Sequence, residues 1–162
     1  SPPGAILVVN REKGFRQAIA ELYPNITLVG AQSAEGWKKE IAITIMNSFL
    51  QANKDLSGVF AVNDNMAEGA MIAAEAAGRL SQIKIWGANG QKSTLALIEQ
   101  GKIAGTAYNN CFEQGSLIAN MLYERLTKKL GPAKDAETNV IQIPPFAATL
   151  ETIKQIAPED RW

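Results

Sequence analysis

The sequence predicts an α/β fold, an open parallel sheet with helices on both faces, and two patterns carry that prediction. Short apolar runs of strand length alternate along the chain with longer segments whose apolar residues recur at helical spacing. The breaks between them are rich in Gly, Pro and Asn, which favour turns. With 162 residues, 46% of them hydrophobic and 20% charged, the chain has the size and composition of one globular domain. We therefore expect a single α/β unit over residues 1–162.

The chain opens with a helix, predicted over residues 6–23 and ended by Pro24. Its apolar face is formed by side chains at helical spacing, namely Val8, Phe15, Ile19 and Leu22. The apolar run at 26–29 then predicts a strand that ends at Gly30. A polar loop containing Trp37 leads to a second helix. The apolar face of this helix consists of Ile41, Ile45 and Phe49.

An apolar run at 59–62 predicts a strand that turns directly into a helix. Asp64 or Asn65 is expected to cap this helix, with Glu68 as the capping-box partner. A cap needs only one side chain. Asn63, at the end of the strand, is therefore left for another role.

The remaining elements alternate in the same way. Strands are predicted over 83–86, 103–108 and 140–143, and helices over about 93–100 and 112–130. A doubly wound domain normally opens with a strand, whereas this chain opens with a helix. We therefore expect that the first strand of the sheet is missing from the chain.

Composition argues against several classes of function. Sixteen Lys and Arg balance sixteen Asp and Glu without any long run of one sign, so we expect no nucleic-acid partner. No apolar stretch approaches the roughly 20 residues of a bilayer-spanning helix, so we expect no direct membrane insertion. The absence of histidine excludes Ser-His-Asp triads and His-ligated metals, and we expect no metal or cofactor. The single cysteine, Cys111, cannot form an internal disulfide.

Distinctive side chains follow four of the predicted strands, and an arginine lies near the start of the first helix. These candidate binding residues are Arg11, Trp37, Asn63, Asn89 and Asn109. Because the carboxyl ends of parallel strands share one edge of a sheet, we expect all five along one rim. Amides donate and accept hydrogen bonds, Arg is a rigid donor and Trp offers a flat apolar face, which together suit a neutral polyhydroxyl ligand. None titrates near neutral pH, so we expect no catalytic residue and no enzyme.

Each of these residues also has an ordinary structural interpretation. An Asn after a strand is often only a turn residue, and Trp37 is more often part of a core than a binding platform. Arg11 is more often a solvated helix residue. The occurrence of three asparagines at equivalent places favours the binding interpretation.

Residues 58–70, GVFAVNDNMAEGA, resemble the central ND-x-MA-x-GA segment of the ribose/galactose-type periplasmic binding proteins, the type 1 solute-binding family. Residues 97–106, LIEQGKIAGT, resemble the GK-x-x-GT element of that family, and the resemblance covers nearly the whole chain. It implies that residues 1–162 are the C-terminal lobe of a two-lobed protein whose N-terminal lobe is absent from this chain. It also implies that the five candidate residues contact sugar hydroxyls or stack on the sugar ring.

The function that the resemblance implies is solute binding for an ABC-type sugar importer. A neutral sugar or polyol would lie between two lobes, and a membrane permease would be the partner. A periplasmic or extracytoplasmic location, after removal of a signal peptide, is implied as well. The alternatives are the ligand-sensing domain of a lac-repressor-type regulator and that of a sensor kinase or chemoreceptor. Family members that bind simple aldoses commonly have an aspartate where Asn89 stands, so the identity of the solute stays open.

Overall fold

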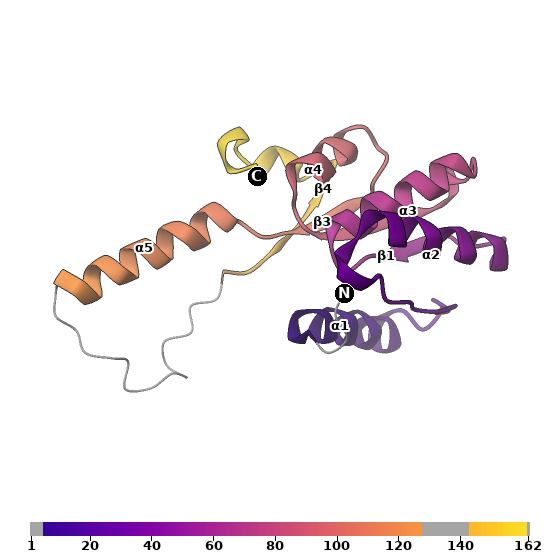
Figure 1. Cartoon of the computed structure of the whole chain (residues 1–162), viewed down its shortest axis with the longest axis horizontal. Coiled ribbons are helices and arrows are strands. Elements are labelled where there is room, and N and C mark those ends of the chain that lie inside the picture. The colour runs from indigo at the N-terminus through magenta and orange to yellow at the C-terminus, as the bar shows by residue number, and fades with distance from the viewer. Residues whose placement is uncertain (1–4, 128–142, 162) are drawn as a thin grey trace.

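A four-stranded sheet covered by helices forms the body of the protein (Figure 1). The computed structural model describes residues 5–127 and 143–161. The helices are α1 (Ile6–Leu22), α2 (Lys39–Ala52), α3 (Asp64–Ala76), α4 (Lys92–Glu99) and α5 (Cys111–Thr127). The strands are β1 (Gly58–Phe60), β2 (Lys84–Asn89), β3 (Gly105–Tyr108) and β4 (Phe146–Thr149).

The sheet has the order β1-β2-β3-β4, and its last strand runs against the others. β1, β2 and β3 are parallel, with Phe60 opposite Trp86 and Asn89 opposite Tyr108. β4 begins with Phe146 opposite Tyr108, the residue at which β3 ends. The predicted open sheet with helices is confirmed, but the prediction that all its strands are parallel is wrong. The chain leaves β3 and returns at the same end of the sheet, and this return fixes the direction of β4.

Two predicted strands differ from the structure. The segment 26–29 belongs to no strand and its apolar side chains are exposed, because no described strand lies beside it to complete a ladder. Of the strand predicted over 140–143, residues 140–142 lie outside the described part of the chain, and Ile143 lies in an irregular segment. Pro144 and Pro145 come directly before β4 instead of closing a strand. Proline lacks an N–H to donate, so the approach to a strand is a position that it tolerates.

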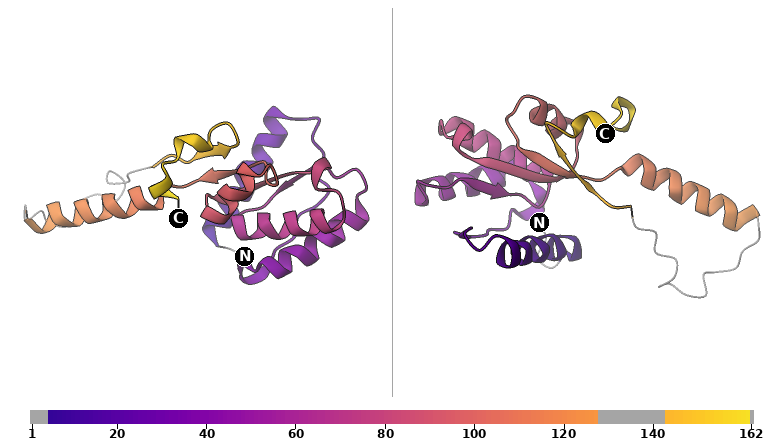
Figure 2. Two further views of the ribbon diagram at one scale, coloured as in Figure 1. Left: turned by 90° about the horizontal axis from the view of Figure 1, so that it is seen from above. Right: turned by 180° about the vertical axis from the view of Figure 1, so that it is seen from behind.

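The core lies between the sheet and helices α2, α3 and α4. Nine of the 13 residues of α3 are buried. Gly69 lets α2 pack closely, because an added Cβ would lie 2.6 Å from the carbonyl oxygen of Lys39. α1 covers the opposite face of the sheet, where Phe15 stacks on Phe60 with ring centroids 4.5 Å apart (Figures 1 and 2). Helices therefore cover both faces, as the sequence predicted.

Helix α5 extends away from this body as a separate arm (Figures 1 and 2). None of its described residues is buried. Its exposed large apolar side chains are Phe112, Ile118, Met121, Leu122, Tyr123 and Leu126. The helix predicted over 112–130 is confirmed as far as Thr127, and residues 128–130 lie outside the described part of the chain. Across the described ranges, no helix pairs enough length with enough hydropathy to span a bilayer.

Candidate ligand-binding site

Asn63 caps the helix that follows β1. Its Oδ1 accepts a hydrogen bond from the Met66 N–H at 2.9 Å, and its side chain is buried. Its extended backbone is the conformation that an N-cap adopts, and its carbonyl accepts the Ala67 N–H at 3.1 Å. The prediction that Asp64 or Asn65 caps this helix is therefore wrong. The cap occupies the oxygen of the Asn63 amide, so its Nδ2 is the group available to donate to a ligand.

Asn89 and Asn109 lie side by side at the ends of β2 and β3. The Asn109 N–H donates to the Asn89 carbonyl at 3.0 Å, and both residues are half-buried. Asn89 has a φ of 133°, a backbone conformation that residues other than glycine rarely adopt. Such strained residues cluster at functional sites, where the surrounding structure holds them in place.

Arg11 joins the ends of two strands. Its Nη1 donates to the carbonyl oxygen of Val62 at 2.6 Å, and its Nη2 donates to Asn89 Oδ1 at 2.9 Å. Burial lowers the pKa of Arg11 and the charge of Asp64 opposes that effect. The expected position of Arg11 at this rim is thus observed. The structure brings Arg11, Asn63, Asn89 and Asn109 together at the carboxyl edge of the sheet.

Trp37, the fifth predicted binding residue, lies in the turn just before α2. It ends a short turn over Glu35–Trp37 just before α2 and packs, partly buried, against the hydrophobic core. Its φ is 60°, so it shares with Asn89 the positive backbone angle that is unusual outside glycine. Its role as a stacking platform stays a prediction.

Asp64 is the residue of this rim that the sequence reasoning missed. Its side chain is fully buried, and its Oδ2 accepts from the Gly90 N–H and the Gln91 N–H, each at 2.7 Å. Its Oδ1 accepts from Thr106 Oγ1 at 2.7 Å. Burial raises the pKa of Asp64, and the hydrogen bonds from Thr106, Gln91 and Gly90 oppose that rise. The sequence does show an acidic residue directly after the asparagine that ends the strand, but its pattern is interpreted above only as a helix cap.

Glu68 has a different role from the expected capping box. It is buried one turn farther along α3, where its Oε1 accepts from Ser93 Oγ at 2.6 Å and from Thr94 Oγ1 at 2.8 Å. Its Oε2 pairs with Lys39 at the start of α2. The capping-box interpretation is therefore wrong. Glu68 instead ties the first turns of α2 and α4 to α3.

The described side chains of the rim form hydrogen bonds, as binding of a neutral polar solute would require. Its polar groups are amides, which donate and accept hydrogen bonds, and a guanidinium, which only donates, and neither kind titrates near neutral pH. Its one carboxylate, Asp64, is fully buried and engaged by three donors. Within the described part of the chain, no group of three acidic or cysteine side chains is placed to hold a metal ion.

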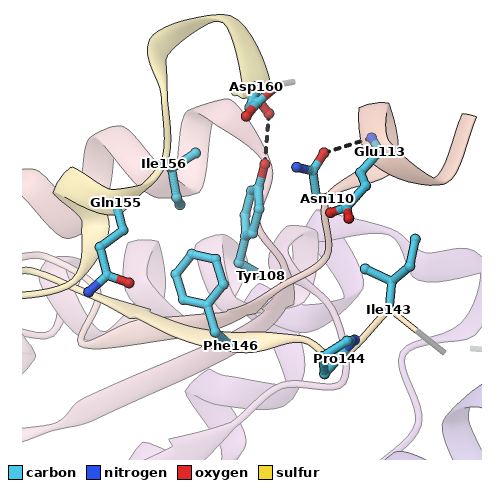
Figure 3. A pocket seen from close by; sticks show the side chains of 9 residues that line it. All are labelled: Tyr108, Asn110, Glu113, Ile143, Pro144, Phe146, Gln155, Ile156 and Asp160. Carbon is cyan, nitrogen blue, oxygen red and sulfur yellow. Dashed lines mark hydrogen bonds between the residues drawn. The ribbon is translucent and has the colours of Figure 1, made fainter. Parts of the chain in front are cut away.

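A small pocket of about 110 Å³ lies beside Tyr108, next to the rim (Figure 3). It is bounded by the segments that leave and re-enter the sheet and by the C-terminal segment, from which the Asp160 carbonyl accepts the Tyr108 hydroxyl at 2.8 Å. None of the five predicted binding residues lines it. This pocket is therefore separate from the candidate site.

A sequence model of the periplasmic binding protein domain matches residues 2–130. The chain belongs to the periplasmic binding protein family. The resemblance seen in residues 58–70 and 97–106 is thus confirmed. The family fold is confirmed independently, because a periplasmic solute binding protein of an ABC transporter from Actinobacillus succinogenes, solved with bound D-allose, superposes with a TM-score of 0.81 at 31% identity. That match covers 91% of this chain and 50% of the solved one.

Two curated relatives of this periplasmic binding protein chain are also binding proteins by name. The D-apiose import binding protein of Actinobacillus succinogenes is 35% identical over 104 residues, which is 64% of this chain and 33% of the relative. The xylitol-binding protein of Mycolicibacterium smegmatis is 33% identical over 110 residues, 67% of this chain and 31% of the relative. The chain therefore spans about a third of the length of these curated relatives.

Proposed function

We propose that this chain is the C-terminal lobe of a two-lobed solute-binding protein that serves an ABC-type importer and holds a neutral sugar or polyol between its lobes. The observation that carries the proposal is the cluster of Arg11, Asn63, Asn89 and Asn109 at one edge of the sheet. It offers uncharged amide groups and one guanidinium, as hydroxyl-rich solutes require. The names of the relatives, which include binding proteins for apiose and xylitol, support the same class of ligand.

The uncovered surface of α5 supports the two-lobed arrangement. A helix with large apolar side chains normally buries them, and exposed apolar patches mark interaction sites. No described residue of α5 is buried, and the apolar side chains of Phe112, Leu122 and Leu126 are each more than 60% exposed. We propose that the N-terminal lobe of the two-lobed protein covers this helix. A membrane permease as partner and a periplasmic or extracytoplasmic location belong to the same proposal.

The hydrogen-bond geometry suggests which groups would meet the solute. The cap uses Asn63 Oδ1 and Arg11 uses Asn89 Oδ1, so both amides are left with their Nδ2 groups as donors. Solute hydroxyl oxygens would accept from them. Each donor left buried and unpaired by a wrong solute costs about 1 to 3 kcal/mol, which is how such a site selects among sugars. An asparagine in place of the aspartate of aldose-binding relatives removes a charge-assisted acceptor, and we propose a solute with fewer donors to satisfy.

The test uses the full-length protein and two substitutions that remove a donor. Asn63→Asp keeps the capping oxygen but loses the Nδ2 group, and Asn89→Ala removes the whole amide. We expect each to weaken binding by about tenfold or more, measured by calorimetry with D-ribose, D-apiose, D-allose and xylitol. Asn53→Ala is the control, since the Asn53 amide only caps the far end of α2. Wild-type affinity in both site variants would contradict the assignment.

A second test addresses the two lobes. If the solute contacts both lobes, residues 1–162 alone provide only part of the contacts, and we expect binding at least about a hundredfold weaker than in the full-length protein. The comparison uses the sugar that the full-length protein binds most tightly. Equal affinity of the two proteins would contradict the two-lobed site.

A further inference from the structure

Asn89 keeps an unfavourable backbone conformation because its neighbours are held on several sides. Its φ of 133° is sterically unfavourable for any residue other than glycine. Arg11 holds its side chain and the Asn109 N–H holds its carbonyl. Neither contact fixes the residues that follow it. That part of the loop, Gly90 and Gln91, is held by Asp64.

The carboxylate of Asp64 lies at the centre of this loop. It accepts from two successive backbone N–H groups, Gly90 and Gln91, and from the Thr106 hydroxyl on the neighbouring strand. Gly87 makes room for it, because a Cβ there would lie 2.3 Å from Asp64 Oδ1. One fully buried side chain thus links the start of α3 to β2, β3 and the loop after β2.

Tyr108 closes the other side of the same loop. A Cβ on Gly90 would lie 2.2 Å from Tyr108 Cδ2, so the ring of Tyr108 packs directly against Gly90. Tyr108 is itself buried, and its hydroxyl donates to the Asp160 carbonyl (Figure 3). Gly90 has a φ of 85°. It lies between the Asp64 carboxylate, which accepts a hydrogen bond from its N–H, and the ring of Tyr108, which packs against its Cα.

We propose that Asp64 is a positioning residue of the ligand site: by fixing Gly90, Gln91 and Thr106, it keeps Asn89 in the conformation that presents its amide to the solute. Each of the three strand-end asparagines is close in sequence to a group that Asp64 holds or to Asp64 itself. Asn63 precedes it, Asn89 precedes Gly90, and Asn109 follows Thr106 by three residues on β3. The inference rests on the proposed function, because it assigns Asp64 to the same site.

A matched residue on the same helix separates positioning from ordinary stabilisation. Glu68 is also a buried carboxylate of α3 with three hydrogen-bonding partners, but those partners are Lys39 at the start of α2 and Ser93 and Thr94 in α4, beyond the loop of Gly90 and Gln91. Asp64→Ala and Glu68→Ala should therefore both weaken the fold, whereas only the first should move Asn89. Asp64→Asn is the conservative variant, since its oxygen can still accept from the loop and its Nδ2 can donate to the Thr106 hydroxyl.

Two measurements on the full-length protein test the proposal. The first is the affinity for whichever of D-ribose, D-apiose, D-allose and xylitol binds the wild type most tightly. We expect Asp64→Ala to lose about tenfold or more, with Glu68→Ala and Asp64→Asn within about threefold of the wild type. The second is hydrogen exchange of the Asn109 amide without ligand, which reports whether the Asn89 carbonyl is still in place. We expect exchange at least about tenfold faster in Asp64→Ala than in Glu68→Ala.

A second pair of variants covers the case in which Asp64→Ala does not fold. Thr106 and Thr94 are both fully buried, and each donates its hydroxyl to one of the two carboxylates, Asp64 or Glu68. Thr106→Val should speed Asn109 exchange and weaken binding by about threefold, while Thr94→Val should do neither. Equal effects of the Asp64 and Glu68 variants, or of the two threonine variants, would overturn the proposal. A wild type that binds none of the four probes would refute the proposed function, and Asn109 exchange would still decide the role of Asp64.

Discussion

Helices α3 and α5 differ sharply in how much of each helix the rest of the chain covers. Nine of the 13 residues of α3 are buried, including two carboxylates, whereas none of the described residues of the 17-residue α5 is buried. α3 lies at the centre of the core, and its two buried carboxylates accept hydrogen bonds from other parts of this chain. The large apolar side chains of α5 are exposed, because no other described part of the chain packs over them. The contrast fits the proposal that a second lobe covers α5.

The largest expected effect comes from removing a buried charge of α3. In Glu68→Ala, Lys39 loses its carboxylate and two hydroxyls lose their acceptor. We expect the free energy of unfolding to fall by about 2 to 4 kcal/mol, measured by urea denaturation of the 162-residue chain. The control is Glu75→Ala on the same helix, because Glu75 pairs with Lys102 at the surface and an exposed pair contributes about 0 to 1 kcal/mol. Similar losses in the two variants would contradict the central role of the Glu68 contacts.

Two glycines compare the packing of the two helices directly. A methyl group on Gly69 would meet the Lys39 carbonyl oxygen at 2.6 Å and Ala42 Cβ at 2.9 Å, so α2 and α3 would have to separate. We expect Gly69→Ala to lower the free energy of unfolding by about 1 to 3 kcal/mol. Gly115→Ala in α5 would meet nothing within 4 Å, and should change it by at most about 1 kcal/mol, in the stabilising direction. A destabilising Gly115→Ala in this chain would show that α5 is covered after all.

The pH dependence of stability sharpens the description of α3. Burial raises the pKa of Glu68, but hydrogen bonds from Lys39, Ser93 and Thr94 outweigh it and hold the pKa below its ordinary value. Such a carboxyl stabilises the fold fully above its unfolded pKa, about 4.3, and loses this contribution as pH falls through the lower folded value. We expect wild type to exceed Glu68→Gln in free energy of unfolding at pH 7, and the difference to shrink below about pH 4. A difference that is constant with pH would contradict the shifted pKa.

The smallest effect is expected on the outer surface of α5. Leu122 is 61% exposed, so Leu122→Ser should change the stability of the 162-residue chain by no more than about 0.5 kcal/mol. In the full-length protein the same substitution should be clearly destabilising, because the proposed second lobe would cover this helix. Thermal denaturation of both proteins, with and without the substitution, gives the comparison. An unchanged melting temperature in the full-length protein would argue against α5 as part of the contact between lobes.

Local patterns in the sequence were enough to predict most elements of the fold. Helical spacing predicted α1 over residues 6–23, one residue longer than observed, and indicated α2 and α3 without bounds, because their apolar residues repeat along short segments. The direction of β4 could not be predicted, since it depends on pairing with β3 across a separation of more than 35 residues. The segment 26–29 has the apolar pattern of a strand but no described neighbour to pair with, and a local pattern cannot reveal that.

The candidate site shows the same division. Position at the end of a strand was enough to place Asn63, Asn89 and Asn109 on one edge, and the contact between Arg11 and Asn89 fits that placement. The choice of Asn63 over Asp64 as the cap depends on partners far along the chain, Gly90 and Thr106, which draw the Asp64 side chain inward. No spacing rule in a single sequence contains that information.

The entry and exit of the chain at one corner of the sheet have a mechanical consequence. β3 ends at Tyr108 directly opposite Phe146, where β4 begins, and the two rings lie 5.2 Å apart. The arm that carries α5 is thus joined to the sheet by two segments that meet it at neighbouring positions. A movement of α5 relative to the sheet would pivot about this corner, and Asn109 is the first residue beyond β3. The affinity for a solute bound to Asn109 would therefore depend on the orientation of α5 relative to the sheet.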